Sequence, residues 1–467
     1  MKPTIPFGSS ENPFKRKEFI GQRIKKRYDQ FKSLGHKHGG VYMFTSPSYL
    51  PIDPEYIKNI MQRDFQYFMD RGAYYNEKDD PLTAHLFNLE GQKWKNLRSK
   101  LTPTFTSGKM KMMFPIMIEC TKQLLDAMDE FYTKKQAVDV KSILSSFTTD
   151  IIGSCAFGLE CNSFTDANSK FIEYGKRMFT SISKSQTLSQ VIVLASPDLG
   201  RRLGIVITPR EISDFFINIV RETIEYRRKA NVVRKDFLQI LMDLQDTDKN
   251  TEGALTIEEV AAQAFVFFLA GYETSSSTMS FCLFELALNA NIQEKVRNEI
   301  FNTLKGYNGE ITYEAITDLK YLGQVVDETL RKYPPASVIP RTCTEDYNIP
   351  ETNVVIEKGT RLFIPIYALH HDEEYYPNPD VFDPDRFSEE NRNKRHPFTY
   401  MPFGEGPRIC IGLRFGLIQT KIGLVTLLKN YRFSVSTRTK IPLEIDPTNL
   451  VLSPKDGIWL ELERLTD

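Results

Sequence analysis

The chain has 467 residues, and its 60 Lys and Arg residues balance its 60 Asp and Glu residues. This balance excludes a bulk nucleic-acid binder, which would carry an excess of basic residues. Hydrophobic residues make up 41% of the chain and aromatic residues 12%, so it has enough apolar material for a large core and is not a disordered protein. The six scattered cysteines argue against a disulfide-stapled secreted fold and favour a reducing, cytosol-facing compartment.

Met1 leads directly into the Pro-rich segment 2–7, so we expect neither a signal peptide nor a targeting helix in this sequence. For segment 2–7 we expect an extended conformation. The next residues predict a charged helix over 15–32 and strands over 40–44 and 48–50. No apolar run in the chain reaches the ~18 residues of a membrane-spanning helix. The longest candidate, Val260 to Gly271, has twelve residues and contains Gln263.

The middle of the chain, from Met110 to about Leu330, is predicted to be mostly helical. Its clearest helix begins at the capping box Thr256-Ile257-Glu258-Glu259 and continues to about Leu288. At ~1.5 Å per residue this helix would be about 50 Å long, so we expect it to cross the domain as a buried central helix.

The C-terminal part changes to Pro-rich loops and short strands. The pattern predicts a strand over 360–364 and a hairpin over 451–460, with its turn at Ser453 to Gly457. We find no internal repeat and no low-complexity segment. The sequence therefore predicts one domain over 1–467, mainly α with small β-sheets, in an α+β fold.

The most specific segment is Phe403-Gly404-Glu405-Gly406-Pro407-Arg408-Ile409-Cys410-Ile411-Gly412. Its glycines allow a tight turn in which backbone N–H groups point at one atom. Cys410 precedes a helix predicted over 413–428, and a helix N-terminus favours a thiolate. Such a thiolate suits an axial iron ligand. A phosphate loop is excluded because no Lys-Ser/Thr follows the glycines, whereas a buried structural cysteine remains an alternative for this loop considered alone.

The whole segment matches Phe-x-x-Gly-x-Arg-x-Cys-x-Gly, the haem-binding signature of the cytochrome P-450 family. The sequence resembles that family over essentially its entire length, and its central helix and cysteine region are closest to insect microsomal, xenobiotic-metabolising members. Four further family motifs occur in the expected order: Trp94-Lys95-Asn96-Leu97-Arg98, Ala270-Gly271-Tyr272-Glu273-Thr274-Ser275, Glu328-Thr329-Leu330-Arg331 and Phe382-Asp383-Pro384-Asp385-Arg386-Phe387. The resemblance implies the cytochrome P-450 fold, with a long central helix over a haem.

The resemblance also implies the residues that bind haem b (iron protoporphyrin IX). They are Cys410 as the axial thiolate ligand of the iron, Phe403, Gly404, Gly406 and Gly412 in its loop, and Trp94, Arg98, Arg341 and Arg408 at the two propionates. Indole N–H and guanidinium groups suit carboxylates. For each arginine alone, a surface role is the alternative.

Two further groups of polar residues receive roles from the resemblance. Glu273 and Thr274 would form the acid–alcohol pair that relays protons to bound O2, although a mid-helix Thr often bonds only to a preceding carbonyl. Glu328 and Arg331 lie three residues apart on one helix face, and Arg386 would join them in a buried cluster with a structural role. An ordinary solvated face is the alternative for that cluster.

The six histidines show no metal-ligand spacing, and we interpret them as non-ligands.

The positions that the resemblance assigns to the substrate pocket are apolar and aromatic, which suits a lipophilic small molecule. Plain core packing is the alternative for each. They are Leu82, Leu86, Phe87, Phe265, Phe268, Leu269, Val338, Ile339 and Leu452.

A haem-thiolate monooxygenase is therefore the expected function. One oxygen atom of O2 would enter a xenobiotic, such as a plant toxin or insecticide, or an endogenous lipid, and the other would become water. No nicotinamide or flavin motif occurs in the chain, so NADPH-derived electrons would come through a separate flavoprotein, an NADPH-cytochrome reductase, with cytochrome b5 as a second donor. Because microsomal relatives carry an anchor before a similar Pro-rich segment, we expect an anchor-truncated enzyme of the endoplasmic reticulum membrane, on its cytosolic face.

Two other functions remain alternatives. A haem-thiolate peroxide isomerase or dehydratase needs no reductase, and such relatives tend to lose the acid–alcohol pair that is intact here. A non-enzymatic haem sensor would need only Cys410. For reductase docking we expect a basic patch formed by Lys95, Lys100, Arg414 and Lys421.

Overall fold

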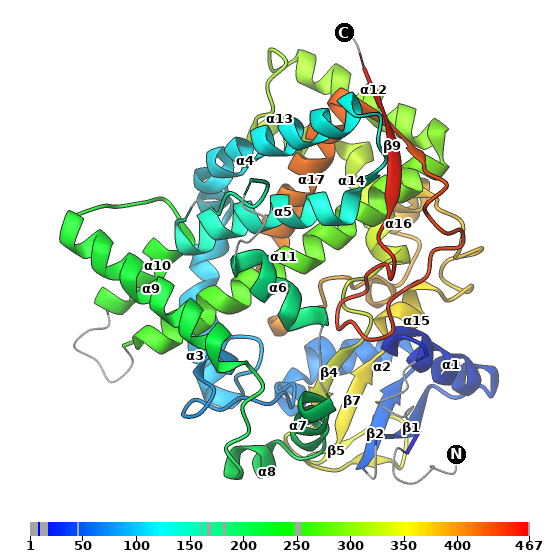
Figure 1. Cartoon of the computed structure of the whole chain (residues 1–467). Helices are drawn as coiled ribbons and strands as arrows, with labels where there is room; N and C mark the ends of the chain where they lie inside the picture. The colour runs from blue at the N-terminus through cyan, green and yellow to red at the C-terminus, as the bar shows by residue number, and fades with distance from the viewer. Residues whose placement is uncertain are drawn as a thin grey trace.

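The computed structural model describes residues 8–9, 17–43, 46–159, 161–165, 170–180, 184–247 and 254–465. The N-terminal segment 2–7 and Phe44 of the first predicted strand lie outside these ranges. Helices form most of the described molecule, and most strands gather at one end, beside the N-terminus (Figure 1). The helices are α1 (Ile20–Ser33), α2 (Pro54–Lys58), α3 (Gly91–Leu101), α4 (Ser107–Thr133), α5 (Val140–Ile152), α6 (Lys170–Thr180), α7 (Lys184–Ala195), α8 (Pro197–Arg202), α9 (Arg210–Ala230), α10 (Phe237–Thr247), α11 (Ile257–Leu288), α12 (Ala290–Lys305), α13 (Tyr313–Asp318), α14 (Lys320–Lys332), α15 (Ile366–His370), α16 (Glu389–Arg392) and α17 (Leu413–Asn430).

Within the described ranges, the strands form three small sheets. Their bounds are β1 (His38–Met43), β2 (Ser46–Pro51), β3 (Val138–Asp139), β4 (Ile339–Thr342), β5 (Tyr347–Asn348), β6 (Val355–Ile356), β7 (Arg361–Ile364), β8 (Tyr431–Val435) and β9 (Trp459–Arg464). The largest sheet has the order β1-β2-β7-β4, in which β7 runs parallel to β2 and antiparallel to β4. In this sheet Arg341 on β4 pairs with Leu362 on β7. Leu362 belongs to a second hydrophobic core, separate from the main one, that also contains Leu50 and Ile364.

The predicted central helix is confirmed as α11, which begins at the predicted capping box. Thr256 Oγ1 accepts from the Glu259 N–H, and the Glu259 carboxylate accepts from the Thr256 N–H. The helix has 32 residues, most of them buried, and it crosses the molecule between α5, α9 and α17. Gly271 allows a close approach to α5, because a Cβ there would collide with the side chain of Ile152.

The predicted C-terminal hairpin is wrong. Residues 451–458 form no strand, and β9 pairs instead with β8 and, at its start, with β3. The physical reason is long-range packing, since Leu460 and Leu462 of β9 lie opposite Val435 and Phe433 of β8 and join the main core. The strand at 361–364 and the helix from Leu413 agree with the prediction.

Candidate active site

The cysteine loop, residues 401–412, is a compact turn that leads into α17. The Cys410 N–H donates to the Phe403 carbonyl at 2.9 Å, and the Ile409 N–H donates to the Gly406 carbonyl at 3.0 Å. Gly404 and Gly406 have φ of +72° and +73°, a conformation that other residues rarely adopt. A Cβ on Gly406 would also collide with the Met61 carbonyl oxygen, so the loop closes only with glycine at this position.

The Cys410 side chain is exposed, although protein groups surround it closely. Desolvation by those groups raises the pKa of its thiol, while the Gly412 N–H and the positive charges of Arg71 and Arg98 oppose the shift. A coordinated cation stabilises a thiolate further and deprotonates a coordinating thiol. The loop therefore presents an accessible sulfur that can become a thiolate on binding a metal. Gly412 adds open space beside it, because a Cβ there would have no neighbour within 4 Å.

Arginines from separate elements lie beside this loop. Arg98 on α3 donates from Nη2 to the Ile409 carbonyl at 2.9 Å. Arg408 donates from Nη2 to the Leu89 carbonyl at 2.8 Å, and its guanidinium stacks 4.1 Å from the ring centroid of Trp94.

Arg341 on β4 is only 1% exposed. Burial, followed by the nearby charge of Arg408, lowers the pKa of Arg341 to about 9. The structure thus brings the four predicted propionate contacts to the neighbourhood of the cysteine loop.

Arg71 is a member of this cluster that the sequence analysis missed. It donates to the Phe87 carbonyl at 3.1 Å and to the Arg408 carbonyl at 3.4 Å, and its guanidinium lies 3.8 Å from the Phe87 ring centroid. Burial, then the charges of Arg341 and Arg408, push the pKa of Arg71 well below its usual value. No motif surrounds Arg71, so only the folded chain reveals its position.

The positive charges of Arg71, Arg98, Arg341 and Arg408 are only partly balanced by acidic residues nearby. The one ion pair that the described residues form with these arginines joins Arg408 Nη2 to Asp70 Oδ1 at 3.7 Å. The Nε atoms of Arg71, Arg341 and Arg408 are buried without a hydrogen-bond partner. Buried guanidinium groups in this state suit a ligand with carboxylates. Together with an accessible thiol, they fit haem, whose iron takes a thiolate and whose two propionates are anionic.

One stripe of the surface of helix α11 is accessible to solvent near this site. Ala270 is exposed in the middle of the buried helix, and Val266 and Thr274, one turn away on either side, are half-buried. The Thr274 hydroxyl donates to the Ala270 carbonyl at 2.5 Å. α17 crosses α11 here, because a Cβ on Gly416 would lie 3.9 Å from the Ser275 hydroxyl.

Glu273 points away from Thr274, toward α5. Its Oε2 accepts from Lys141 Nζ at 3.0 Å, and its Oε1 accepts from the Ser277 hydroxyl at 3.4 Å. Both partners of the ion pair are largely buried. The predicted acid–alcohol pair is therefore adjacent in sequence without direct contact, and Lys141 is a second residue that no motif indicated.

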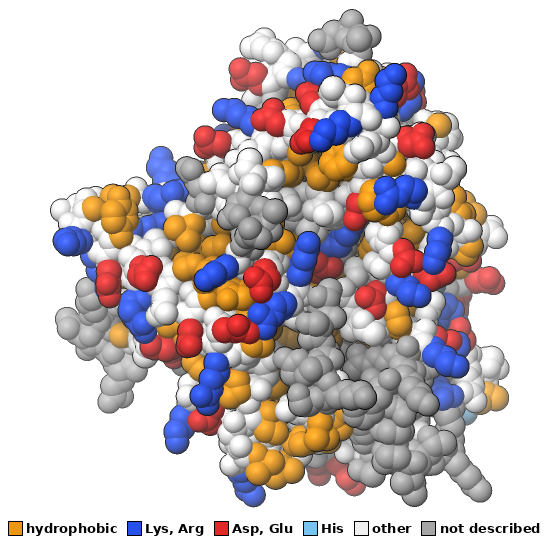
Figure 2. All heavy atoms as spheres, in the orientation of Figure 1, with side chains coloured by type: hydrophobic (Ala, Val, Ile, Leu, Met, Phe, Trp, Pro, Cys, Tyr) orange, Lys and Arg blue, Asp and Glu red, His pale blue; other side chains and the backbone are white. Residues whose placement is uncertain are grey.

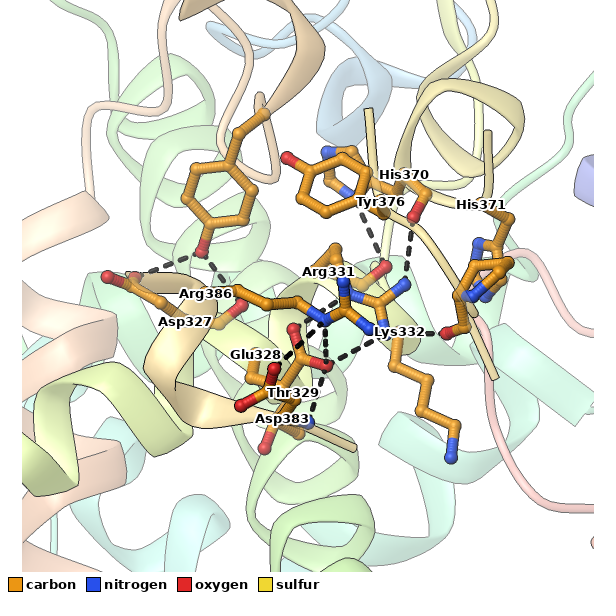
Figure 3. A network of polar contacts seen from close by, with 12 residues as sticks. Asp327, Glu328, Thr329, Arg331, Lys332, His370, His371, Tyr376, Asp383 and Arg386 are labelled. Carbon is orange, nitrogen blue, oxygen red and sulfur yellow. Dashed lines mark hydrogen bonds and ion pairs between the residues drawn. The ribbon is translucent and has the colours of Figure 1, made fainter. Parts of the chain in front are cut away.

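The Glu328 cluster forms a buried network on α14, where Arg331 and Arg386 converge on one carboxylate (Figure 3). Arg331 donates to both Glu328 oxygens, at 2.7 and 2.9 Å, and both side chains are 0% exposed. Arg386 Nε lies 3.5 Å from Glu328 Oε1, which also accepts from the Asp383 N–H at 3.0 Å. Burial raises the pKa of Glu328, and Arg331 opposes this shift.

His370, at the end of α15, connects this cluster to the cysteine loop. Its Nε2 accepts from the Met401 N–H at 3.0 Å, so Nδ1 carries the proton and faces the Arg331 carbonyl at 3.2 Å. Arg331 in turn donates to the His370 carbonyl at 2.8 Å. Burial, followed by the charge of Arg331, lowers the pKa of His370 to about 3.

The predicted pocket residues divide into two groups. Phe87 is 46% exposed, and Leu269, Val338 and Ile339 are half-buried. The others lie in the apolar core: Leu82, Leu86, Phe265, Phe268 and Leu452. Phe265 and Phe268 pack against Phe216 of α9, with ring centroids 5.0 and 5.3 Å away.

Of the four residues expected in a basic patch, Lys95 and Arg414 are exposed and Lys100 is half-buried. Lys421 does not fit the expectation. Its Nζ donates to the carbonyls of Leu319, at 2.9 Å, and Ile316, at 3.3 Å, and burial lowers its pKa. The sequence could not show this, because α13 and α14 cover Lys421 only in the folded chain.

An α+β fold that holds an accessible thiol beside buried arginines is the arrangement expected of a haem-thiolate protein. In agreement, the family model of cytochrome P450 matches residues 13–461. The chain is 46% identical over 460 residues to "Probable cytochrome P450 6a14" of Drosophila melanogaster, covering 96% of this chain and 89% of that protein. It is 42% identical to "Cytochrome P450 6A1" of Musca domestica, covering 96% and 89%, and 43% identical to "Cytochrome P450 6a2" of Drosophila melanogaster, covering 94% and 88%.

The chain belongs to the cytochrome P450 family. It is a haem-thiolate monooxygenase that uses O2, electrons delivered by a reductase and lipophilic substrates. Among the described residues, no helix has the length and apolar character needed to cross a membrane.

Proposed function

We propose that Cys410 is the axial haem ligand of this monooxygenase, within a single catalytic domain that spans residues 1–467. The observation that carries the proposal is the accessible Cys410 thiol in a glycine-dependent loop beside buried arginines with little negative charge of their own. Phe403, Gly404, Gly406 and Gly412 shape the loop around it. When bound, the haem activates O2 and supplies one oxygen atom to the substrate.

The arginine cluster and Trp94 would hold the two haem carboxylates. Arg98 and Arg408 are already held by backbone carbonyls of the loop and of segment 85–89, so they are preorganised for an anion. Arg341 and Arg71 add buried positive charge from β4 and from the segment before α3.

Thr274 would hold a proton at Oγ1 on the accessible stripe of α11. The hydroxyl donates to the Ala270 carbonyl, and rotation about the Cβ–Oγ1 bond of Thr274 would direct its proton toward the site. Glu273 would supply protons from the side of α5, and Lys141 acts as a positioning residue that holds its carboxylate. The half-buried apolar residues and Phe87 would contact the substrate.

The Cys410→Ser variant tests this function. We expect it to lose the long-wavelength band of the reduced carbon monoxide complex and the monooxygenase activity, because an alcohol is a much poorer electron donor than a thiolate. Gln419→Ala, a buried residue on α17, the helix that follows the loop, serves as the folded control that keeps the band. A Cys410→Ser protein that retains both the band and the activity would refute the assignment.

We also propose that the enzyme works at the cytosolic face of the endoplasmic reticulum membrane, with an NADPH-cytochrome reductase and with cytochrome b5 as a second electron donor. Family membership supports this location, and so do exposed leucines on α7, on α8 and just after it. They are Leu188, Leu194, Leu199 and Leu203. Hydrophobic side chains gather over α8 at the lower edge of the face in Figure 2.

Binding to phosphatidylcholine vesicles tests the surface on α8. Replacing Leu199 and Leu203 by Ser should weaken vesicle binding, because it removes the apolar area that the bilayer would bury. Val233→Ser, an exposed apolar residue elsewhere, is the matched control. Equal binding of all three proteins would contradict the role of this surface, and recovery of the native protein outside the microsomal fraction would contradict the location.

A further inference from the structure

An open hollow of about 350 Å³ lies beside α14, and the proposed function assigns it no role. Its walls come from the end of α13, from α14, from α16 and from α17. Its lining residues, all within the described ranges, include none of the cysteine loop and none of the arginine cluster. Its volume falls in the range of small-molecule sites. The charged residues of the lining are Lys320, Asp327, Glu389, Arg392 and Lys421.

Two lysines of this lining lack an acidic partner. Among the residues that the structure describes, neither Lys320 nor Lys421 forms an ion pair. The Lys421 Nζ donates instead to the carbonyls of Leu319 and Ile316, and burial lowers the pKa of Lys421. An ammonium group has three N–H donors, so these two carbonyls leave one donor of Lys421 for a ligand. Because burial disfavours the charged lysine, an anion beside it would be stabilising.

The two acidic residues of the lining do not balance its basic residues. Asp327 is already engaged, because its Oδ2 lies 3.6 Å from Arg392 Nη1 and its Oδ1 accepts from the Tyr400 hydroxyl at 2.9 Å. Glu389 is exposed on α16 and forms no ion pair with a described residue. Outside the pair of Asp327 with Arg392, the lining thus carries two positive charges and one negative charge. This balance favours an anionic ligand.

Gly323 on α14 leaves room for such a ligand. A Cβ at this position would have only the Lys421 side chain within 4 Å, with Nζ at 3.5 Å. Glycine is unfavourable inside a helix, and neither a close approach of backbone nor a positive φ requires it here. Space for a ligand gives a reason for this glycine. Leu319 and Phe387 add apolar surface to the hollow, so it suits an organic anion better than a simple ion.

The hollow has a short connection to the cysteine loop. The Tyr400 hydroxyl donates to Asp327 in the lining, and the Tyr400 ring stacks on His370, with ring centroids 5.4 Å apart. His370 in turn accepts from the Met401 N–H at the start of the loop. Asp327 also directly precedes Glu328 on α14, in the network of Figure 3. A ligand in the hollow would therefore touch the residues that support the loop.

We propose that this hollow binds a small organic anion with one or two carboxylates, held by Lys421 and Lys320, and that the bound anion stabilises the elements that hold the cysteine loop. The carboxylate accepts the third N–H of Lys421, and the apolar part of the anion covers Leu319 and Phe387. The anion thereby bridges α14 and α17. Since it binds the folded protein and not the unfolded chain, it stabilises the folded state.

Calorimetric titration of the purified holoenzyme with phthalate tests the site, and phthalamide is the matched neutral probe. We expect phthalamide to bind about tenfold more weakly than phthalate, because only the anion makes charge-assisted hydrogen bonds. Lys421→Met should weaken phthalate binding about tenfold for the same reason. Gly323→Leu fills the hollow without changing the charge and should abolish phthalate binding. Lys305→Met, which replaces an exposed lysine of α12, controls for lost surface charge and should bind phthalate as the wild type does.

Haem transfer to apomyoglobin, followed by absorbance, measures the effect on the cysteine loop. Saturating phthalate should slow the transfer severalfold in the wild type and leave it unchanged in Gly323→Leu. No phthalate binding by the wild type, equal binding of phthalate and phthalamide, undiminished binding by Gly323→Leu, or haem transfer that phthalate does not slow would each overturn the proposal. The carbon monoxide band of each protein reports the Cys410 ligation separately, so failure of the anion site and failure of the proposed function are distinguishable.

Discussion

At the scale of single residues, buried ion pairs make testable contributions to stability, and the pair of Glu328 with Arg331 is the clearest case. The Glu328→Ala substitution leaves Arg331 buried without a counter-ion, at a cost of ~3–5 kcal/mol. We expect little haem incorporation, measured as haem absorbance per purified protein. Glu77→Ala, which breaks an exposed pair with Lys93, is the control and should load haem normally. A folded, haem-loaded Glu328→Ala protein would contradict the structural role.

The Lys141–Glu273 pair makes a second prediction for single residues. Lys141→Met leaves the Glu273 carboxylate buried and unpaired, so we expect the free energy of unfolding to fall by ~3–5 kcal/mol. Adding Glu273→Gln removes the stranded charge and should restore most of that stability, while O2-dependent turnover stays slow because the acid is gone. Urea unfolding of the four proteins of this double-mutant cycle measures the coupling. A double variant destabilised by the sum of the two single changes would show that the two groups are not coupled.

At the scale of elements, α15 joins the Glu328 cluster to the cysteine loop through neutral His370. Its folded pKa of about 3 lies below the ordinary value near 6.5, so its contribution to stability is present above pH 6.5 and is lost as the pH falls toward 3. At pH 5 the loss is about 2 kcal/mol for this one group.

Urea unfolding at pH 7 and pH 5 checks this dependence. His370→Gln retains a side-chain acceptor for the Met401 N–H and does not titrate, so its difference in stability between the two pH values should be about 2 kcal/mol smaller than that of the wild type. His36→Gln, which replaces an exposed histidine, should keep the wild-type difference. The same difference in His370→Gln and in the wild type would refute the prediction.

At the scale of the whole molecule, zero net charge conceals local charge near the cysteine loop. Lys95 and Arg414 are both exposed. Lys95 lies on α3, whose Arg98 donates to the Ile409 carbonyl of this loop, and Arg414 lies at the start of α17, directly after the loop. We expect Lys95→Glu with Arg414→Glu to slow reductase-supported turnover severalfold, with an effect that weakens as salt is added, because charge steering acts on association. Peroxide-driven turnover bypasses the reductase and should change little. Equal loss in both assays would mean damage to the haem site.

The elements that the sequence predicted well are those with local signals. The capping box placed the start of α11, and the glycine-rich segment with Cys410 marked the start of α17, because capping and turn chemistry depend on residues only a few positions apart. The prediction of a C-terminal hairpin was wrong because β9 pairs with β8 and not with residues 451–452. A strand pairs with whichever neighbour buries its apolar face, and local spacing does not record that neighbour.

The sequence by itself determined the class of this protein, since the cysteine segment and four ordered motifs indicate a haem-thiolate enzyme and family membership agrees. Only the tertiary structure decided which groups surround those motifs. Arg71 and Lys141 belong to no motif, and Lys421 is covered by carbonyls of another segment. Burial and charge pairing depend on which segments of the chain come together in space, and this depends on packing across more than a hundred residues of sequence rather than on local spacing.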